Sequence, residues 1–240
     1  MKAIILAAGR GSRLNKLTDK QPKCLLEING QTMFDRQLEI LKEFSTINNI
    51  AVITGYLSEL LARSGLQSFH NANWKETNMV CSLLGADEWL SGDTCVVTYS
   101  DIIYEKHAIS KIMQSKADVA ILYDREWELL WKERFDDPLC DAESFQISNR
   151  NHVIDIGQRV QSISSIKGQY MGILKFSPQG WHKFKSTCFR KHPAELAQAD
   201  ITSILKDMII NGNEIEAVRY RGRWAEVDSE RDLMIARRIF

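Results

Sequence analysis

The sequence predicts a three-layer αβα fold of the α/β class, in which helices cover both faces of a mostly parallel central sheet. Short apolar or β-branched runs alternate with amphipathic helical patterns through the first half of the chain, which is typical of parallel sheets flanked by helices. A chain of 240 residues with 44% hydrophobic and 26% charged residues is also long and apolar enough for a substantial core.

The first half of the chain supplies most of the predicted sheet. The first strand is the apolar run 2–6, and strand 94–99 is β-branched and ends at Ser100 and Asp101. Helical spacing gives segment 32–44 an apolar stripe, and Asn78 or Thr77 is suited to cap helix 79–90. The elements expected here are strand 2–6, helix 32–44, strand 49–54, helix 79–90, strand 94–99, helix 106–114 and strand 118–122.

The regular alternation stops after residue 124. Segment 124–170 is expected to be a small inserted lid region that leans over the sheet within a single domain, 1–240, because no linker composition separates it. Beyond or within it we expect strands 145–147, 153–156 and 169–176, helices 178–189 and 201–211, strand 215–220, an extended segment 224–228 and helix 229–238.

The composition excludes several classes of protein. Thirty-one basic residues balance thirty-one acidic ones, so no overall field favours nucleic acid or anionic lipid as a partner. Five scattered cysteines without CxxC spacing indicate neither a zinc site nor a disulfide framework. The apolar N-terminal stretch is too short for a signal peptide and no stretch is long enough to span a bilayer, so a cytoplasmic location is expected.

A glycine-containing loop follows the first strand, in the segment Leu6-Ala7-Ala8-Gly9-Arg10-Gly11-Ser12-Arg13-Leu14. Its two glycines allow the backbone to wrap closely around a ligand, and Arg13 with Lys23 indicates that the ligand is an anion. A dinucleotide-binding loop would need a third glycine where Leu14 stands, and no Walker A lysine is present. A nucleoside triphosphate is the ligand that this loop favours.

Three carboxylates are candidates for a metal site. Asp101 follows strand 94–99, at the edge of a parallel sheet where ligands bind. Glu226 and Asp228 are two residues apart in an extended segment, so their side chains point to the same side. Together they could hold Mg²⁺ against a triphosphate. Alternatively, Asp101 caps a helix, and the other two belong to a solvated strand end.

The N-terminal loop, together with Pro22-Lys23, resembles the signature loop of the nucleotidyltransferases that activate sugar phosphates and related phosphate esters. This resemblance implies the Rossmann-like fold of the nucleotide-diphospho-sugar transferases, with Lys23, Arg13 and Asp101 as catalytic residues. In the cytidylyltransferase branch of that family an aspartate after the central strand and a late Glu-x-Asp hold the metal, which implies Mg²⁺ on Asp101, Glu226 and Asp228. The nucleotide-binding residues that the loop implies are Leu6, Ala7, Ala8, Gly9, Gly11, Ser12, Arg13 and Lys23.

The run Asn78-Met79-Val80-Cys81-Ser82-Leu83 resembles the helix start that lines the base pocket in cytidylyltransferases acting on phosphocholine and similar phosphorylated amines. Asn78 and Ser82 offer the donors and acceptors that a pyrimidine edge requires. An ordinary capped helix is the alternative reading.

Segments 137–145 and 168–172 look like segments shared by cytidylyltransferases for phosphocholine and aminoalkylphosphonates. Aromatic faces attract cationic head groups, and carboxylates pair with them, so an acceptor-binding group is expected in this region. Core packing of the aromatics and solvated loop charges are the alternatives. The candidate acceptor-binding residues are Trp127, Trp131, Asp141, Glu143 and Tyr170.

The resemblance implies Mg²⁺-dependent transfer of CMP from CTP to a small phosphorylated or phosphonate amine, such as phosphocholine or 2-aminoethylphosphonate, by a monomer or homodimer. No Glu-Lys-Pro segment of the kind that grips a sugar follows strand 118–122, which favours the amine. The alternatives are a sugar-1-phosphate nucleotidyltransferase that uses UTP, dTTP or CTP, and a non-catalytic nucleotide-sensing subunit of the same fold.

Overall fold

A seven-stranded sheet forms the centre of the molecule in the computed structural model, which describes residues 1–240. All neighbouring strands are parallel except around β11, which runs antiparallel to both β6 and β8. The mostly parallel sheet predicted from the sequence is therefore confirmed. In spatial order its strands are β12 (Glu216–Tyr220), β8 (Val119–Asp124), β11 (Gln169–Phe176), β6 (Cys95–Tyr99), β1 (Lys2–Ala7), β4 (Asn49–Thr54) and β5 (Gln67–His70).

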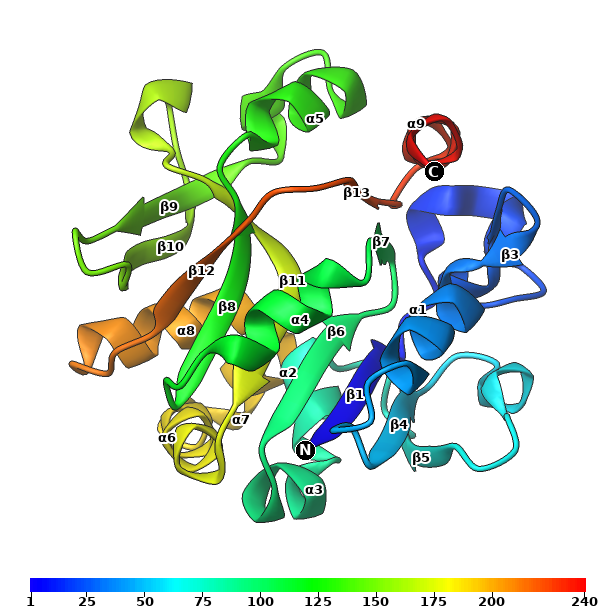
Figure 1. The fold of residues 1–240 in the computed structure, drawn as a ribbon, viewed down its shortest axis with the longest axis horizontal. Helices are drawn as coiled ribbons and strands as arrows, with labels where there is room; N and C mark the ends of the chain where they lie inside the picture. Colours follow the sequence, from blue (N-terminus) through cyan, green and yellow to red (C-terminus); the bar gives the residue numbers. More distant parts are fainter.

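Helices cover both faces of this sheet (Figure 1). In that view α1 and α4 cross the near face, whereas α2 and α8 lie behind it. The central strands have helices on both sides, so they are continuous apolar runs: Ala3, Ile4 and Ile5 of β1 are fully buried. The helices are α1 (Met33–Lys42), α2 (Met79–Leu84), α3 (Asp87–Gly92), α4 (His107–Gln114), α5 (Trp127–Arg134), α6 (Pro178–Cys188), α7 (Pro193–Gln198), α8 (Ile201–Ile210) and α9 (Glu230–Ile239). No helix has the length and apolar character needed to cross a membrane.

The single helix expected over 79–90 is wrong, because the chain forms α2 and α3 there. Gly85 ends α2 and Ala86 has non-helical dihedral angles (φ −98°, ψ 20°). A glycine in a helix interior loses about 1 kcal/mol relative to alanine, so the break occurs where helix propensity is lowest. Asp87 and Glu88 then lie in the first turn of a new helix, where acidic residues are favoured.

Segment 124–170 contributes α5 and an antiparallel hairpin of β9 (Glu143–Ile147) and β10 (Val153–Arg159). Figure 1 shows both at one end of the sheet, on the side opposite β4 and β5. The hairpin packs against α8 and against β11, so it belongs to the same core as the sheet.

Two further pairs of short strands are present, of which the sequence indicated only residues 224–226, within the extended segment 224–228. They are β2 (Glu27–Ile28) with β3 (Gln31–Thr32), and β7 (Ile102–Tyr104) with β13 (Trp224–Glu226), both antiparallel. Runs of two or three residues carry no measurable periodicity, which explains the omission. The β7–β13 pair matters for the site because it brings the C-terminal segment beside the end of β6.

Candidate active site

A cavity of about 150 Å³ lies where β1 and β6 end. Six of the predicted nucleotide-binding and catalytic residues of the N-terminal loop and β6 line it together with Asn78 and Ser82. Ala7 and Ser12 are not among its lining residues, and Arg13 lines the neighbouring cavity instead. The lining residues are Leu6, Ala8, Gly9, Gly11, Lys23, Trp74, Thr77, Asn78, Met79, Ser82, Tyr99, Ser100 and Asp101.

Gly11 holds the loop against Lys23. Its φ of +79° is in the left-handed region that favours glycine, and a Cβ built there would lie 2.7 Å from Cβ of Lys23. Any other residue would therefore both strain the backbone and displace the lysine. Gly9 has open space around it, so its absence of a side chain leaves the cavity accessible to a ligand.

Asn78 caps α2 and also lines this first cavity. Its side-chain oxygen accepts from the backbone N–H of Met79 at 2.8 Å, and its amide donates to the carbonyl of Gln198. Ser82 accepts a hydrogen bond from Asn71 at 2.8 Å. The capped helix is therefore present, and the base-pocket role of Asn78 stays a prediction with which its position in the cavity is compatible. Sequence reasoning missed Asn71 and Trp74 because they lie in an irregular segment.

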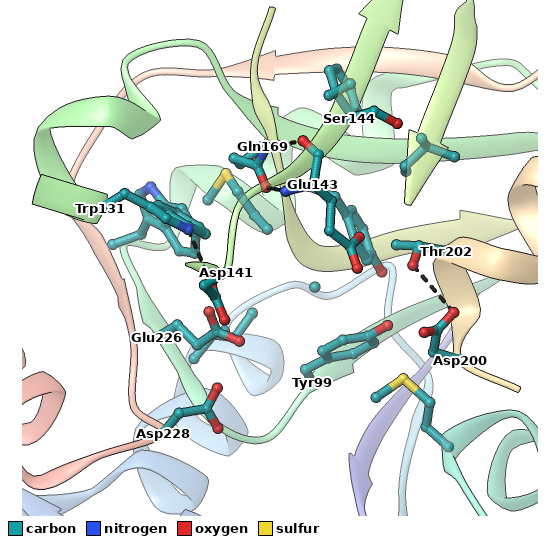
Figure 2. Close-up of a pocket in the computed structure, with 18 of the residues that line it drawn as sticks. Tyr99, Trp131, Asp141, Glu143, Ser144, Gln169, Asp200, Thr202, Glu226 and Asp228 are labelled. Carbon is teal, nitrogen blue, oxygen red and sulfur yellow. Dashed lines mark hydrogen bonds between the residues drawn. The ribbon is translucent and has the colours of Figure 1, made fainter. Parts of the chain in front are cut away.

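A second cavity, of about 230 Å³, adjoins the first (Figure 2). Tyr99 and Met79 line both cavities and so form their common wall. Acidic and aromatic side chains dominate the lining, with Arg13 as the single basic member. The polar and aromatic lining residues are Arg13, Tyr99, Trp131, Asp141, Glu143, Ser144, Phe145, Gln169, Tyr170, Asp200, Thr202, Trp224, Glu226 and Asp228.

The three carboxylates proposed as metal ligands lie together between the two cavities. One oxygen from each of Asp101, Glu226 and Asp228 lies within 4.8 Å of the others. The β7–β13 ladder causes this, because Glu226 pairs with Ile102 and the N–H of Val227 donates to the carbonyl of Asp101 at 2.8 Å. The predicted gathering of these three acids is therefore seen in the structure.

Lys23 lies inside this carboxylate cluster. Its Nζ is 2.7 Å from Oδ2 of Asp101 and 2.5 Å from Oδ1 of Asp228. Burial opposes a charge on Lys23, but the two carboxylates outweigh it and raise the pKa of the ammonium above its usual range. Arg13 adds a second cation, 2.9 Å from Asp228. The two side chains assigned to phosphates are thus paired with acids assigned to the metal.

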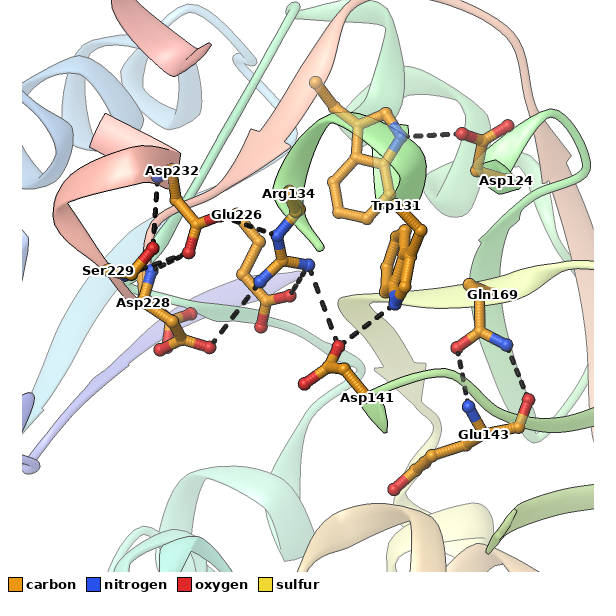
Figure 3. A network of polar contacts seen from close by, with 12 residues as sticks. Asp124, Trp131, Arg134, Asp141, Glu143, Gln169, Glu226, Asp228, Ser229 and Asp232 are labelled. Carbon is orange, nitrogen blue, oxygen red and sulfur yellow. Dashed lines mark hydrogen bonds and ion pairs between the residues drawn. The ribbon is translucent and has the colours of Figure 1, made fainter. Parts of the chain in front are cut away.

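Arg134, at the end of α5, organises the same cluster from the other side (Figure 3). Its side chain is fully buried, with Nη1 2.7 Å from Glu226 and Nε 3.0 Å from Asp232. Asp141 and Asp228 lie farther away, at 4.0 and 3.8 Å. A guanidinium can face several carboxylates at once because its donors point in a fixed planar fork.

Asp232 couples this network to the start of α9. Its carboxylate accepts from the backbone N–H groups of Asp228 and Ser229, at 3.0 and 2.9 Å, while Ser229 accepts from the N–H of Asp232. This capping box fixes the backbone of Asp228. Sequence analysis missed both Arg134 and Asp232. The Ser229-x-x-Asp232 spacing could have revealed the cap, but no local sequence signal indicates that Arg134 pairs with Asp232.

The charges of the cluster are distributed unevenly. Burial raises the pKa of Glu226 to about 7, against the charge of Arg134, and repulsion from Asp228 and Asp101 contributes to the rise. Burial also opposes ionisation of Asp228, but Lys23, Arg13 and Arg134 hold its pKa below the usual range. A further cation would therefore be most favourable beside Glu226.

The donor set fits a hard divalent cation. Three carboxylates supply the oxygen ligands that Mg²⁺ and Ca²⁺ prefer. Oδ1 of Asp101 is buried and has no hydrogen-bond partner, although its other oxygen is paired with Lys23. A buried carboxylate oxygen without a partner is costly, and a bound cation would satisfy it.

The predicted acceptor-binding residues divide into two groups. Trp131, Asp141, Glu143 and Tyr170 line the second cavity, and Nε1 of Trp131 donates to Asp141 at 3.0 Å. Trp127 does not line it: this side chain is 2% exposed and packs edge-on against Trp131. The placement of Trp127 in an acceptor site is therefore corrected, because Trp127 lies on the same face of α5 as Trp131 but one turn earlier, where it is buried in the core outside the cavity.

The family of MobA-like NTP transferase domains matches residues 3–217 of the chain. The CTP:phosphoglutamine cytidylyltransferase of Campylobacter jejuni is 34% identical, over 98% of this chain and 98% of that protein. The choline-phosphate cytidylyltransferase of Streptococcus pneumoniae is 40% identical over 95 residues, which cover 38% of this chain and 41% of that one.

Solved structures share the fold. A glucose-1-phosphate thymidylyltransferase structure from Bacillus anthracis superposes with a TM-score of 0.78 at 22% identity, covering 99% of this chain and 94% of the other. The CTP:phosphocholine cytidylyltransferase of Streptococcus pneumoniae gives 0.75 at 24% identity, covering 99% and 98%. The match over residues 3–217 and the full-length relative carry the assignment. The chain belongs to the MobA-like NTP transferase family and is a nucleotidyltransferase.

Proposed function

We propose that this enzyme transfers CMP from CTP to an anionic oxygen of a small phosphorylated or phosphonate amine and releases pyrophosphate. The observation that carries the proposal is the junction of two cavities of opposite character. One is formed by a glycine loop and Lys23, the other by acids and aromatics, and they meet at Asp101 and Asp228.

The nucleotide is assigned to the cavity beneath the β1 loop. Backbone N–H groups around Gly9 and Gly11 suit the triphosphate, and Asn78 and Ser82 suit the base. CTP is the preferred donor in this proposal because relatives with that specificity align with the whole chain or with large parts of it.

The reaction requires charge stabilisation more than a base. The attacking oxygen of a phosphate is already an anion near neutral pH, so no side chain needs to remove a proton from it. A bond forms between this oxygen and the α-phosphorus as the bond to the pyrophosphate oxygen breaks. We assign Lys23 to neutralising charge near the α-phosphate, and Arg13, which pairs with Asp228, to holding the leaving pyrophosphate.

Mg²⁺ is assigned to Asp101, Glu226 and Asp228. When bound, it would screen the repulsion between the two anionic reactants. Arg134 holds Glu226 in place, and Asp232 holds the backbone of Asp228, so both carboxylates are oriented before a metal binds.

The amine is assigned to the second cavity because five of its lining residues are Asp or Glu and one is basic. Such a surface repels a second anionic group and attracts an ammonium. Carboxylates can also accept hydrogen bonds from sugar hydroxyls, so it is the excess of negative charge that favours an ammonium here.

A pyrophosphate-release assay tests this function. Each of CTP, UTP, dTTP, ATP and GTP is supplied alone, then with phosphocholine, 2-aminoethylphosphonate, phosphoglutamine or glucose 1-phosphate. Release is expected only with CTP and one or more of the three nitrogen compounds. Release with glucose 1-phosphate would instead establish a sugar nucleotidyltransferase, and nucleotide binding without release under any condition would establish a sensing role.

The metal assignment has its own test. Asp101→Ala should lower turnover at least about a hundredfold, a size typical of removing one such electrostatic contact. It should also weaken Mn²⁺ binding in the absence of nucleotide, as followed by electron paramagnetic resonance. Asp93→Ala, an exposed aspartate paired with Lys2, is the matched control. Unchanged turnover in Asp101→Ala would refute the assignment.

A further inference from the structure

The five acids of the second cavity are of two kinds. Asp141, Glu226 and Asp228 each have an arginine or lysine nitrogen within 4.0 Å. Glu143 and Asp200 have no cationic nitrogen within that distance, although both line the same cavity. The cavity therefore contains two carboxylates that form no direct ion pair with an arginine or lysine of the protein.

These two carboxylates lie at the end of the cavity away from the metal cluster. In Figure 2, Glu143 and Asp200 lie near Tyr99 and Thr202, whereas Glu226 and Asp228 lie at the opposite end. A molecule that places its phosphate by the metal cluster would extend its other end toward Glu143 and Asp200.

The structure holds both groups firmly without using all their oxygens. The backbone of Glu143 is fixed by Gln169, which accepts from its N–H and donates to its carbonyl. The side chain that lies ready to donate to the Glu143 carboxylate is Thr202, whose hydroxyl donates at 3.2 Å to Asp200. Asp200 caps α8 through Oδ1, which accepts from Ser203 at 2.7 Å and from Thr202 at 3.2 Å. Its Oδ2 has no such partner. Oxygens of both carboxylates are therefore free to accept hydrogen bonds.

A cage of tryptophans for a quaternary ammonium is not present in this cavity. Trp127 is buried outside it, and Trp131 already faces the guanidinium of Arg134, 4.9 Å from the ring centroid. Trp224 packs against Trp131, and its indole N–H donates to Asp124. Only the tyrosines near Glu143 leave aromatic surface for a ligand, and they pack edge to face with each other.

We propose that Glu143 and Asp200 form a subsite that selects acceptors with a primary ammonium group over acceptors with a quaternary one. This inference rests on the proposed function and specifies its substrate class. An N–H donor can bond to the free carboxylate oxygens, whereas a trimethylammonium group has no N–H and is held by aromatic faces. Burial raises the pKa of Glu143 and the charge of Asp200 raises it further, a repulsion that a bound ammonium relieves.

A methylation series tests the selection directly. With CTP, kcat/KM is measured for phosphoethanolamine, its N-methyl and N,N-dimethyl derivatives, and phosphocholine, which share a charge and lose one N–H at each step. We expect kcat/KM to fall along the series, by about tenfold or more overall, the size of one charge-assisted hydrogen bond. Equal or rising values toward phosphocholine would overturn the subsite while leaving the proposed function intact.

Phosphoglutamine extends the test to a longer acceptor. If phosphoethanolamine is not turned over, phosphoglutamine is compared with its α-N-acetyl derivative, which lacks the ammonium. A large loss in the acetylated compound supports the subsite, and equal turnover contradicts it. If no phosphorylated amine supports pyrophosphate release, the proposed function fails first and the subsite fails with it.

Variants assign the selection to these two residues. Asp200→Asn keeps the ability to cap α8, and Glu143→Gln keeps the shape of the side chain, so both are expected to fold. Each should raise KM for a primary amine about tenfold, leave KM for CTP within twofold, and flatten the methylation series. Glu195→Gln is the matched control, because it is an exposed, unpaired glutamate on neighbouring α7. A loss of kcat with KM unchanged would show a purely structural role and refute the proposal.

Discussion

The nucleotide-side cavity and the acceptor-side cavity are built in different ways. All lining residues of the first lie between Leu6 and Asp101, and its distinctive feature is a contiguous glycine loop. The lining of the second runs from Arg13 to Asp228 and is drawn from segments far apart in the chain. A backbone cradle can be encoded locally, whereas a group of side chains from distant segments requires the complete fold.

The two cavities also share their charges. Lys23 lines the first cavity and Arg13 the second, yet both pair with Asp228 of the C-terminal segment. Without ligands the cations and acids neutralise each other across the junction. Four predictions test how far this contrast between the two sides holds.

Loss of the shared cation should have the largest effect. Lys23→Ala is expected to lower kcat at least about a hundredfold, because it removes charge near the α-phosphate and leaves Asp101 without its cation. Steady-state pyrophosphate release measures it. Lys16→Ala, an exposed lysine of the same loop, is the control and should stay within twofold. Equal losses in both would indicate a general effect of loop charge.

Arg134 tests whether the acceptor side depends on a buried cation. Arg134→Gln should lower the free energy of unfolding by about 3 kcal/mol, because Glu226 and Asp232 then face each other without a guanidinium between them. Urea denaturation gives the value. Arg231→Gln breaks an exposed pair with Asp136 and should cost less than about 1 kcal/mol. Similar losses in the two variants would contradict the role given to burial.

Metal and CTP should favour each other's binding. In the ion pairs of Lys23 with Asp101 and Asp228, the metal would bind the carboxylates and CTP would bind the lysine, so each ligand frees the partner that the other needs. Removing Mg²⁺ is expected to weaken CTP binding about tenfold, within the usual range of coupling between sites. Calorimetric titration with and without MgCl₂ measures the ratio. Asp228→Asn should reduce that ratio. Mg²⁺ pairs with free CTP to the same extent whichever protein is titrated, so a difference between the ratios of the wild type and the variant comes from the protein. An unchanged ratio would show that the two sites are independent.

The smallest effect is expected at Trp127. Trp127→Phe should change the KM for the acceptor by no more than about twofold, since this side chain is buried outside the cavity. Trp131→Phe should raise it several-fold, because the change removes the indole N–H that holds Asp141 at 3.0 Å. Kinetics over a range of acceptor concentrations separate the two. A larger effect at Trp127 would reopen its place in the acceptor site.

Much of the fold could be predicted because its elements have local signals. The apolar run that forms β1 and the β-branched run that forms β6 are long enough to show their type, and both were placed within one residue of their observed ends. The helix expected over 79–90 failed at Gly85, where one residue's low propensity outweighed the surrounding pattern. The three-residue strands β7 and β13 form because they pair with each other through an antiparallel ladder.

The candidate site shows the same division. Gly11 and Lys23 could be identified from the residues next to them in the sequence, and Asp101 from its position after a predicted strand. Arg134 and Asp232 could not, because an arginine in the last turn of a helix is interpreted as a solvated charge until the opposing segment is known. Asp200 reads from the sequence only as a helix cap. Its second role appears when β9 places Glu143 at the same end of the cavity.

The sequence by itself determined the α/β architecture and the glycine loop, since periodicity and backbone conformation are properties of adjacent residues. Only the tertiary structure decided which arginine holds the predicted acids together and which two acids of the second cavity have no paired cation. The reason is physical: pairing depends on distance and burial between residues as far apart as Lys23 and Asp228, and neither quantity exists until the sheet has formed.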